Sequence, residues 1–240
     1  MLKTVLRELA LHLVGTIVRV ETDQPVAAIS FDDGPNPDNT PKLLDILDLY
    51  NAKATFFVVG QRAAQYPELT QQIAKRGHVV GCHSWDHPSF PVLSSQQRRN
   101  QIKSCEKVIP DTGYRLFRPP FGHQTVMSTL DVRLLGYTTI TWDVLVDDWL
   151  DHDAEKIYQS LMERIRPGSI ILLHDALFFA ECPEHLDRRP TIEAVRQFLS
   201  DRKEYDFVSV PELLRSGKPV KSIWRMQGDP LWLKNQKHWD

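Results

Sequence analysis

The sequence has little cysteine, no excess of charge of either sign and no long uninterrupted apolar run. Its three cysteines, Cys82, Cys105 and Cys182, are widely spaced, which argues against a disulfide framework or a paired-cysteine metal site. The 29 lysines and arginines nearly balance the 31 aspartates and glutamates. Because no overall basic field results, neither a nucleic acid nor an anionic membrane is an expected partner.

Charged residues break up the apolar stretch at the beginning of the chain. Lys3, Arg7 and Glu8 interrupt it, and His12 and Arg19 follow. A secretory signal needs an apolar run of about 7–15 residues and a membrane-spanning helix needs about 20, so neither is predicted. Taken alone, the sequence therefore favours a cytoplasmic location.

The chain of 240 residues, 42% of them hydrophobic, has the size of one ordinary globular domain. Short β-rich runs alternate with segments of helical period, which predicts a parallel α/β sheet. The expected strands cover residues 26–31, 55–59, 78–81, 116–117, 137–142, 169–173 and 207–210, and the expected helices cover 41–50, 61–76, 94–108, 124–135, 153–165 and 190–201. This alternation fits both a closed barrel and an open doubly wound sheet.

Polar side chains follow the ends of five expected strands. They are Asp32 with Asp33, His83, Arg118, Asp147 with Asp148, and His174 with Asp175. In both α/β architectures the carboxyl ends of the strands meet at one edge, which carries the active site. The sequence therefore predicts one shared site.

Two of these segments contain the residue types that bind metal ions. Asp32 and Asp33 are adjacent carboxylates before Gly34, and such anions repel each other unless a cation joins them. His83 and His87 are four residues apart, so a helical turn would direct both imidazoles at one ion. Two histidines with one carboxylate leave a coordination position open, as catalytic sites do. A polar turn and a surface histidine pair are the alternatives for each segment alone.

Two further segments have features of catalytic groups. The prolines in the segment Arg118 to Gly122 stiffen the backbone, which would aim both the guanidinium and the following N–H groups. Those N–H groups would be able to stabilise an oxyanion. His174 ends a buried apolar strand, where a general acid would be well placed. An ordinary proline-rich turn and a structural histidine are the corresponding alternatives.

In this order and spacing, the segments resemble the motifs of the polysaccharide deacetylase family that contains the NodB homology domain, also called carbohydrate esterase family 4. Ser30 to Pro35 resembles its first motif, His83 to His87 its second, Arg118 to Gly122 its third and Leu172 to His174 its fifth. The resemblance implies a distorted (β/α)7 TIM-like barrel in a single domain. Residues 26–216 would form the catalytic domain, with 1–25 as an N-terminal extension and 217–240 as a C-terminal tail.

The resemblance also implies the binding residues. Asp33, His83 and His87 would hold one divalent metal ion, Zn2+ in the first place, with Co2+, Ni2+ or Mn2+ as alternatives. Trp149 and Leu172 would line a small apolar pocket that receives the acetyl methyl group of an acetylated glycan. Members of this family are often extracytoplasmic, which leaves the location open.

Four residues would carry the catalytic roles. Asp32 would act as general base, oriented by Arg118, and His174 would act as general acid. The backbone N–H of Phe121 would stabilise the oxyanion, and because this donor belongs to the main chain, phenylalanine in place of the commoner tyrosine is tolerated.

The fourth motif departs from the family pattern. Asp148 and Trp149 match its end, at the substrate site, but Leu145 occupies the position of the leading aspartate, which would pair with the general acid. Residues two apart point to the same side of an extended strand, so Asp143 or Asp147 is the expected substitute that tunes His174.

The function implied is metal-dependent hydrolysis of N-acetyl groups on an amino-sugar poly- or oligosaccharide. An O-acetyl esterase acting on xylan-like glycans is the nearest alternative, because an ester leaving group demands less of the acid. A noncatalytic carbohydrate-binding protein is an alternative of another class, supported by Leu145 alone. The tail, with Trp224, Trp232 and Trp239, is assigned no chemistry, and the oligomeric state is left open.

Overall fold

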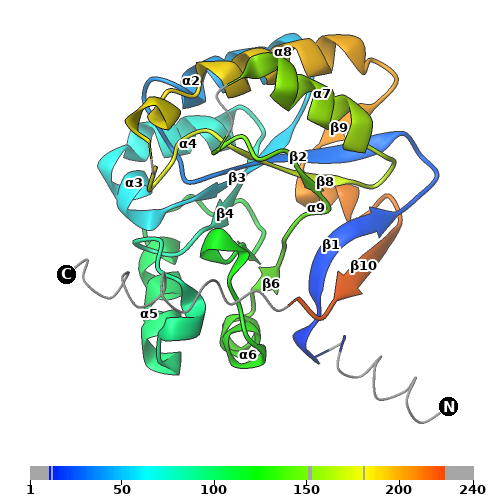
Figure 1. Ribbon diagram of the computed structural model, residues 1–240. Coiled ribbons are helices and arrows are strands. Elements are labelled where there is room, and N and C mark those ends of the chain that lie inside the picture. Colours follow the sequence, from blue (N-terminus) through cyan, green and yellow to red (C-terminus); the bar gives the residue numbers. More distant parts are fainter. Residues whose placement is uncertain (1–10, 12, 151–152, 181, 225–240) are drawn as a thin grey trace, which may run out of the picture.

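The computed structural model describes residues 11, 13–150, 153–180 and 182–224, and it shows a curled parallel sheet with helices around it (Figure 1). In sheet order the strands are β6 (Thr138–Thr139), β5 (Leu116–Phe117), β4 (Val79–Cys82), β3 (Ala54–Val58), β2 (Val26–Asp32), β8 (Ile170–His174) and β7 (Val144–Leu145), and β9 (Asp206–Val208) also pairs with β2. All of these pairings are parallel. The parallel α/β barrel expected from the sequence is confirmed.

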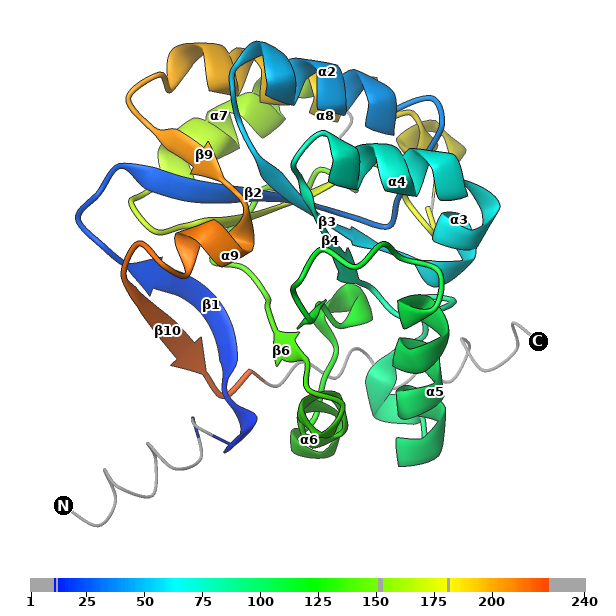
Figure 2. The same ribbon diagram turned by 180° about the vertical axis from the view of Figure 1, so that it is seen from behind.

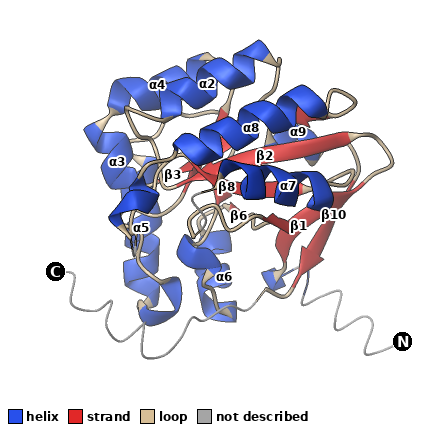
Figure 3. Ribbon diagram, turned by 45° about the horizontal axis from the view of Figure 1, so that its top comes forward, coloured by secondary structure: helices blue, strands red, loops and turns tan. Residues whose placement is uncertain are grey.

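Helices follow the strands and cover the outside of the sheet, as Figures 2 and 3 show from two further sides. They are α2 (Thr40–Leu49), α3 (Gly60–Gln65), α4 (Pro67–Lys75), α5 (Ser95–Glu106), α6 (Val126–Leu134), α7 (Ala154–Arg164), α8 (Arg189–Asp201) and the short α9 (Val210–Leu213). In the described part of the chain, no helix is long and apolar enough to cross a lipid bilayer.

The sheet is buried on both faces, which explains its near-continuous apolar strands. On β3, Phe56 packs in the cluster that contains Leu43 and Leu44 of α2, whereas the neighbouring Phe57 packs with Ile140 in a second cluster. This alternation follows the two-residue period of a strand. Both faces of the sheet therefore contribute to a core that fixes where each strand ends.

Several elements differ from the sequence expectation, and β7 (Val144–Leu145) and α9 (Val210–Leu213) were not expected. The helix expected over 61–76 is divided into α3 and α4, because Pro67 begins a new helix and Tyr66 before it has a non-helical backbone, with φ and ψ of −126° and 60°. The strand expected over 137–142 is reduced to β6, although Ile140 still forms a bridge with Ile17.

The segments at the two ends of the described chain form an antiparallel ribbon that the sequence did not predict. β1 (Thr16–Glu21) pairs with β10 (Lys218–Ser222), with Thr16 opposite Ser222. β1 also reaches the barrel, since Ile17 bridges Ile140 and Arg19 bridges Ser169. These parts of the expected extension and tail therefore pack together against the barrel, whereas residues 1–10 and 225–240 lie outside the described residues.

Candidate active site

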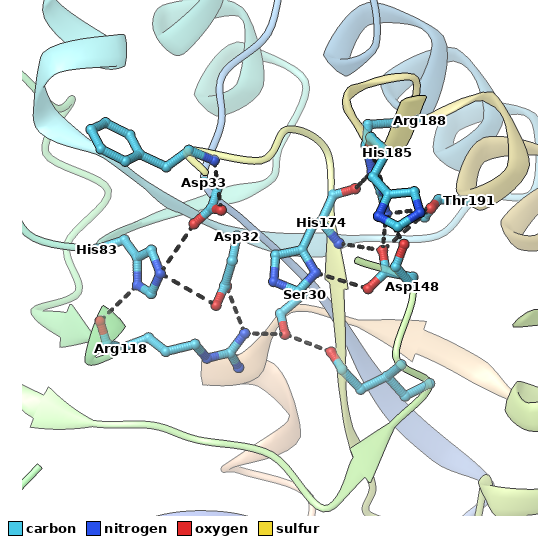
Figure 4. A network of polar contacts seen from close by, with 12 residues as sticks. Ser30, Asp32, Asp33, His83, Arg118, Asp148, His174, His185, Arg188 and Thr191 are labelled. Atoms are coloured by element: carbon cyan, nitrogen blue, oxygen red, sulfur yellow. Dashed lines mark hydrogen bonds and ion pairs between the residues drawn. The ribbon is translucent and has the colours of Figure 1, made fainter. Parts of the chain in front are cut away.

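The polar segments singled out from the sequence meet at the carboxyl ends of the strands (Figure 4). Asp32 ends β2 and Asp33 follows it with a φ of 73°, a left-handed conformation that turns the second carboxylate away from the strand direction. His174 ends β8 and lies opposite Asp32 in the strand register. The predicted convergence of these groups is therefore present in the structure.

Asp33, His83 and His87 form a group able to hold a metal ion. Their three ligand atoms lie within 4.8 Å of one another, and all three residues are buried. Asp33 Oδ1 is 3.4 Å from His83 Nε2 and 3.1 Å from His87 Nε2, yet it accepts no hydrogen bond of good geometry from the described residues. A buried carboxylate oxygen facing two imidazole nitrogens fits a divalent cation.

The loop that carries the two histidines is not the helical turn expected from their spacing. Ser84 and His87 have φ values of 68° and 58°, so the backbone between them is irregular. The hydroxyl of Ser84 accepts a hydrogen bond from the His87 N–H at 3.0 Å, which closes the loop. The imidazole rings still meet, with centroids 4.9 Å apart. The expectation of a helical turn was therefore wrong, although the rings converge.

A hydrogen bond outside the group orients His83. Its Nδ1 lies 2.8 Å from the backbone oxygen of Arg118, and because a carbonyl oxygen only accepts, Nδ1 carries the proton. Nε2 then presents its lone pair toward Asp33, as a metal-binding imidazole must.

The protonation states in the group also suit a cation. Burial would raise the pKa of Asp33, but His87 and His83 beside it hold that pKa well below its usual value. Burial lowers the pKa of His87. An ionised carboxylate with a neutral imidazole is the state in which these side chains bind metals.

Arg118 fixes the other carboxylate of the pair. It is fully buried and donates hydrogen bonds to Asp32 Oδ1 and Ser30 Oγ, each at 2.8 Å, and to the backbone oxygen of Thr141 at 3.0 Å. Its guanidinium also lies 4.2 Å from the centroid of the Phe57 ring. These contacts occupy Oδ1 of Asp32, whose Oδ2 lies 3.7 Å from His83 Nε2.

His174 pairs with Asp148, whereas the sequence analysis expected Asp143 or Asp147 as its partner. Asp148 Oδ1 accepts from His174 Nδ1 at 2.8 Å, and its Oδ2 accepts from the His174 backbone N–H at 3.0 Å. Asp143 instead accepts from the Ile170 N–H. The expectation failed because β7 ends at Leu145 and the backbone turns at Asp147, which has a φ of 53° and is exposed.

The positive charge of protonated His174 and the negative charge of Asp148 stabilise each other. Burial would lower the pKa of His174, but the Asp148 carboxylate outweighs it and raises that pKa above its usual value. Burial would likewise raise the pKa of Asp148, and His174 and Arg188 bring it below its usual value. The pair therefore favours a protonated imidazole.

Arg188 is a buried site residue that the sequence did not reveal. Its Nη2 donates to Asp148 Oδ2 at 2.5 Å, to the Asp148 backbone oxygen at 2.8 Å and to Thr191 Oγ1 at 2.6 Å, while its Nε reaches the His174 backbone oxygen at 3.3 Å. It thus ties together the segments that follow β7 and β8. A lone arginine at the start of an expected helix gave no signal of this role.

One cavity of about 360 Å³ joins the two sides of the site. Its walls include the group of Asp33, His83 and His87, called the metal group below, together with Asp32 and His174. The apolar part of the wall includes Trp142, Leu145, Trp149, Leu172, Leu177 and Phe179. Phe121 also lines it, in a left-handed conformation with a φ of 58°. Leu145, at the departure from the fourth motif, therefore forms cavity wall.

A curled parallel sheet with an Asp–His–His group and two oriented acid–base pairs at its carboxyl edge defines an α/β-barrel hydrolase. The model of the family "Polysaccharide deacetylase" matches residues 19–140. A peptidoglycan-N-acetylglucosamine deacetylase of Bacillus cereus is 35% identical over 204 residues, 82% of this chain and 91% of that protein. A chitooligosaccharide deacetylase of Azorhizobium caulinodans is 34% identical over 169 residues, 69% of this chain and 80% of that protein.

Solved structures agree with the sequence comparison. The crystal structure of the Bc1960 peptidoglycan N-acetylglucosamine deacetylase resembles this chain with a TM-score of 0.75 and 28% identity, covering 85% of this chain and 94% of that one. The chain belongs to the polysaccharide deacetylase family.

Proposed function

We propose that this protein is a metal-dependent deacetylase that hydrolyses N-acetyl groups on amino-sugar glycans of the peptidoglycan or chitooligosaccharide type. One observation is the main support for the proposal: on one side the cavity has the metal group and Asp32, which is bound by Arg118, and on the other side it has the His174–Asp148 pair. The relatives named for N-acetylglucosamine and chitooligosaccharide deacetylation support the choice of substrate.

The metal ligands, Asp32 and Arg118 have separate roles in the first half of the proposed hydrolysis. A divalent cation held by Asp33, His83 and His87, zinc being the natural choice for a histidine and carboxylate set, supplies Lewis acidity at the acyl group. Asp32 removes the proton of the attacking water through Oδ2, because Arg118 occupies Oδ1. Arg118 itself is an orienting residue.

The later half of the reaction uses Phe121, whose ring lies 4.3 Å from that of His87, and His174 on the other side of the cavity. The Phe121 backbone N–H donates to the oxyanion of the tetrahedral intermediate. His174, whose Nδ1 is held by Asp148, delivers a proton from Nε2 to the departing amine, and acetate is released. Trp149 and Leu172 receive the acetyl methyl group in the apolar part of the cavity.

Acetate release from chitooligosaccharides, with and without a chelator, tests this function. We expect turnover by the wild-type protein to depend on the metal, and Asp32→Asn and His174→Ala each to lower kcat by about 10²-fold or more. Near-wild-type turnover by either variant would remove the role assigned to that residue.

The same assay on acetylated xylan addresses O-deacetylation. That alternative drew its support from a general acid without its usual partner, and His174 has a buried carboxylate partner in Asp148. We therefore expect faster acetate release from the chitooligosaccharide. Tight glycan binding without metal-dependent turnover would instead identify a noncatalytic binding protein.

A further inference from the structure

Trp224, just beyond β10, contacts the loop of the third motif although it lies far from that loop in the sequence. Its indole Nε1–H donates a hydrogen bond to the Gly122 backbone oxygen at 2.9 Å. The contact follows from the ribbon, because pairing of β10 with β1 brings the end of the described chain to the barrel. The C-terminal segment therefore reaches the catalytic edge.

The loop held by this hydrogen bond has an unusual backbone. Phe121 and Gly122 have φ values of 58° and 68°, so two successive residues are left-handed. This conformation is costly for a side chain as large as phenylalanine and persists only when surrounding contacts impose it. Within the loop, the Gly122 N–H donates to Pro119 and the His123 N–H donates to Pro120, each at 2.9 Å. Trp224 adds a support from outside the loop.

A second contact of Trp224 reaches the cavity wall. Its ring packs edge-on against Trp142, with centroids 5.3 Å apart and an interplanar angle of 67°. Trp142 lines the cavity, and the Arg118 guanidinium lies 5.7 Å from the centroid of its ring. The same indole therefore supports both the loop that carries Phe121 and the ring that covers Arg118.

Gln124 holds Trp224 in place. This buried side chain donates through Nε2 to the Trp224 backbone oxygen at 3.0 Å and to Thr16 Oγ1 of β1 at 2.6 Å. The ribbon, the loop of the third motif and the C-terminal segment thus form one connected set of contacts.

We infer that Trp224 is a positioning residue of the active site, which holds the turn from Arg118 to Gly122 so that the Phe121 N–H is aimed at the oxyanion. The inference rests on the proposed function, in which that N–H stabilises the transition state. Because such a donor acts on the transition state more than on the bound substrate, loss of its support lowers kcat with little effect on KM.

Trp224→Phe is the direct test, because it keeps an aromatic ring against Trp142 and removes the N–H donor. Thr22→Val is the matched control: it removes the 3.0 Å hydrogen bond from Thr22 Oγ1 to the Ser216 backbone oxygen, which fastens the same terminal segments away from the cavity. With chitooligosaccharide as substrate, we expect Trp224→Phe to lower kcat about tenfold with KM little changed. The control keeps the wild-type kcat and KM.

Hydrogen exchange of the loop provides a readout that does not depend on turnover. In Trp224→Phe, backbone amides of residues 121–125 should exchange faster than in the wild-type and control proteins, while amides of β2 and β8 keep their protection. This result is expected even if the glycan assignment fails, so failure of the proposed function and failure of this inference are distinguishable.

Three outcomes would overturn the inference. They are unchanged kcat and loop exchange in Trp224→Phe, a raised KM with unchanged kcat, and equal losses of kcat in Trp224→Phe and Thr22→Val. If Trp224→Phe fails to fold, Gln124→Met, which removes the donor to the Trp224 backbone oxygen, takes its place and must show the same decrease in kcat and the same faster loop exchange.

Discussion

At the scale of single residues, the partner of His174 differs most from the sequence expectation. The family comparison draws attention to Leu145, but the carboxylate that pairs with His174 is Asp148, further along the same motif. The spacing rule for a strand did not apply, because the backbone leaves the extended conformation at Asp147. Asp148 thus lies at the end of the fourth motif and also raises the pKa of His174, the proposed general acid.

Asp148→Asn should move the alkaline limb of the pH–kcat profile to lower pH. Without the carboxylate, burial is left as the main influence and lowers the pKa of His174, so the acid loses its proton at a lower pH. The profile is measured by acetate release across the neutral and alkaline range.

Asp143→Asn is the control for this prediction. Asp143 bonds the Ile170 N–H and the Arg166 guanidinium, so its replacement should leave the alkaline limb where it is. If the alkaline limb shifted with Asp143→Asn and not with Asp148→Asn, Asp143 would be the residue that tunes His174, as the strand spacing predicts.

The His174–Asp148 pair also affects the stability of the folded protein. The pKa of His174 is raised in the folded protein, so its stabilising contribution is complete below the unfolded pKa of about 6.5. That contribution is lost as the pH rises through the folded value. The acid pair therefore adds stability on the acidic side of neutrality.

At the scale of elements, an observed strand overlaps each of the seven expected ones, and most of these are buried apolar runs that sequence periodicity detects, the two-threonine β6 being the exception. β1 and β10 were missed for a physical reason: their pairing joins the two ends of the described chain, and β10, Lys218–Ser222, is mainly polar. Local patterns predict elements but carry no information on such distant pairing. The histidine loop was missed similarly, because left-handed residues other than glycine leave little local signal.

The connection from β2 to α2 depends on Gly34. A methyl group added at this position would overlap the Asp175 carboxylate. That carboxylate is fully buried, burial raises its pKa to about 7, and it accepts a 2.5 Å hydrogen bond from Thr40 of α2. Because this carboxylate is buried and hydrogen-bonded to Thr40, we expect the added methyl group to displace the neighbouring Asp33 instead.

We therefore expect Gly34→Ala to lower the free energy of unfolding by about 1–3 kcal/mol and to weaken zinc binding. Urea unfolding and zinc titration measure the two effects. Gly113→Ala is the control, since Gly113 lies in a turn with a φ of 78° and no atom within 4 Å of an added methyl group. It should show a loss of stability without a change in zinc affinity, and an equal loss of affinity in both variants would contradict the prediction.

At the scale of the whole molecule, the metal group joins the segments after β2 and β4, so a bound cation would stabilise the folded protein. At a free Zn2+ concentration of 100 times Kd the gain is about 2.7 kcal/mol, which for a protein of this size raises Tm by roughly 5–10 °C. Thermal unfolding with zinc and with a chelator measures the shift.

Two variants separate site binding from a general effect of zinc. Asp33→Ala removes a buried ligand and should abolish the zinc-dependent rise in Tm, whereas Asp38→Ala removes an exposed carboxylate nearby and should retain it. An equal rise in both variants would show that zinc binds elsewhere.

The terminal ribbon also sets an order of events during synthesis. The barrel strands β2 to β8 leave the ribosome before β10, so a nascent chain contains the proposed acid, base and metal ligands before Trp224 is available to support the loop of the third motif. Full turnover would then arise only after the last described strand has docked. The ribbon in this way delays the support of this loop until the chain has been made as far as Trp224.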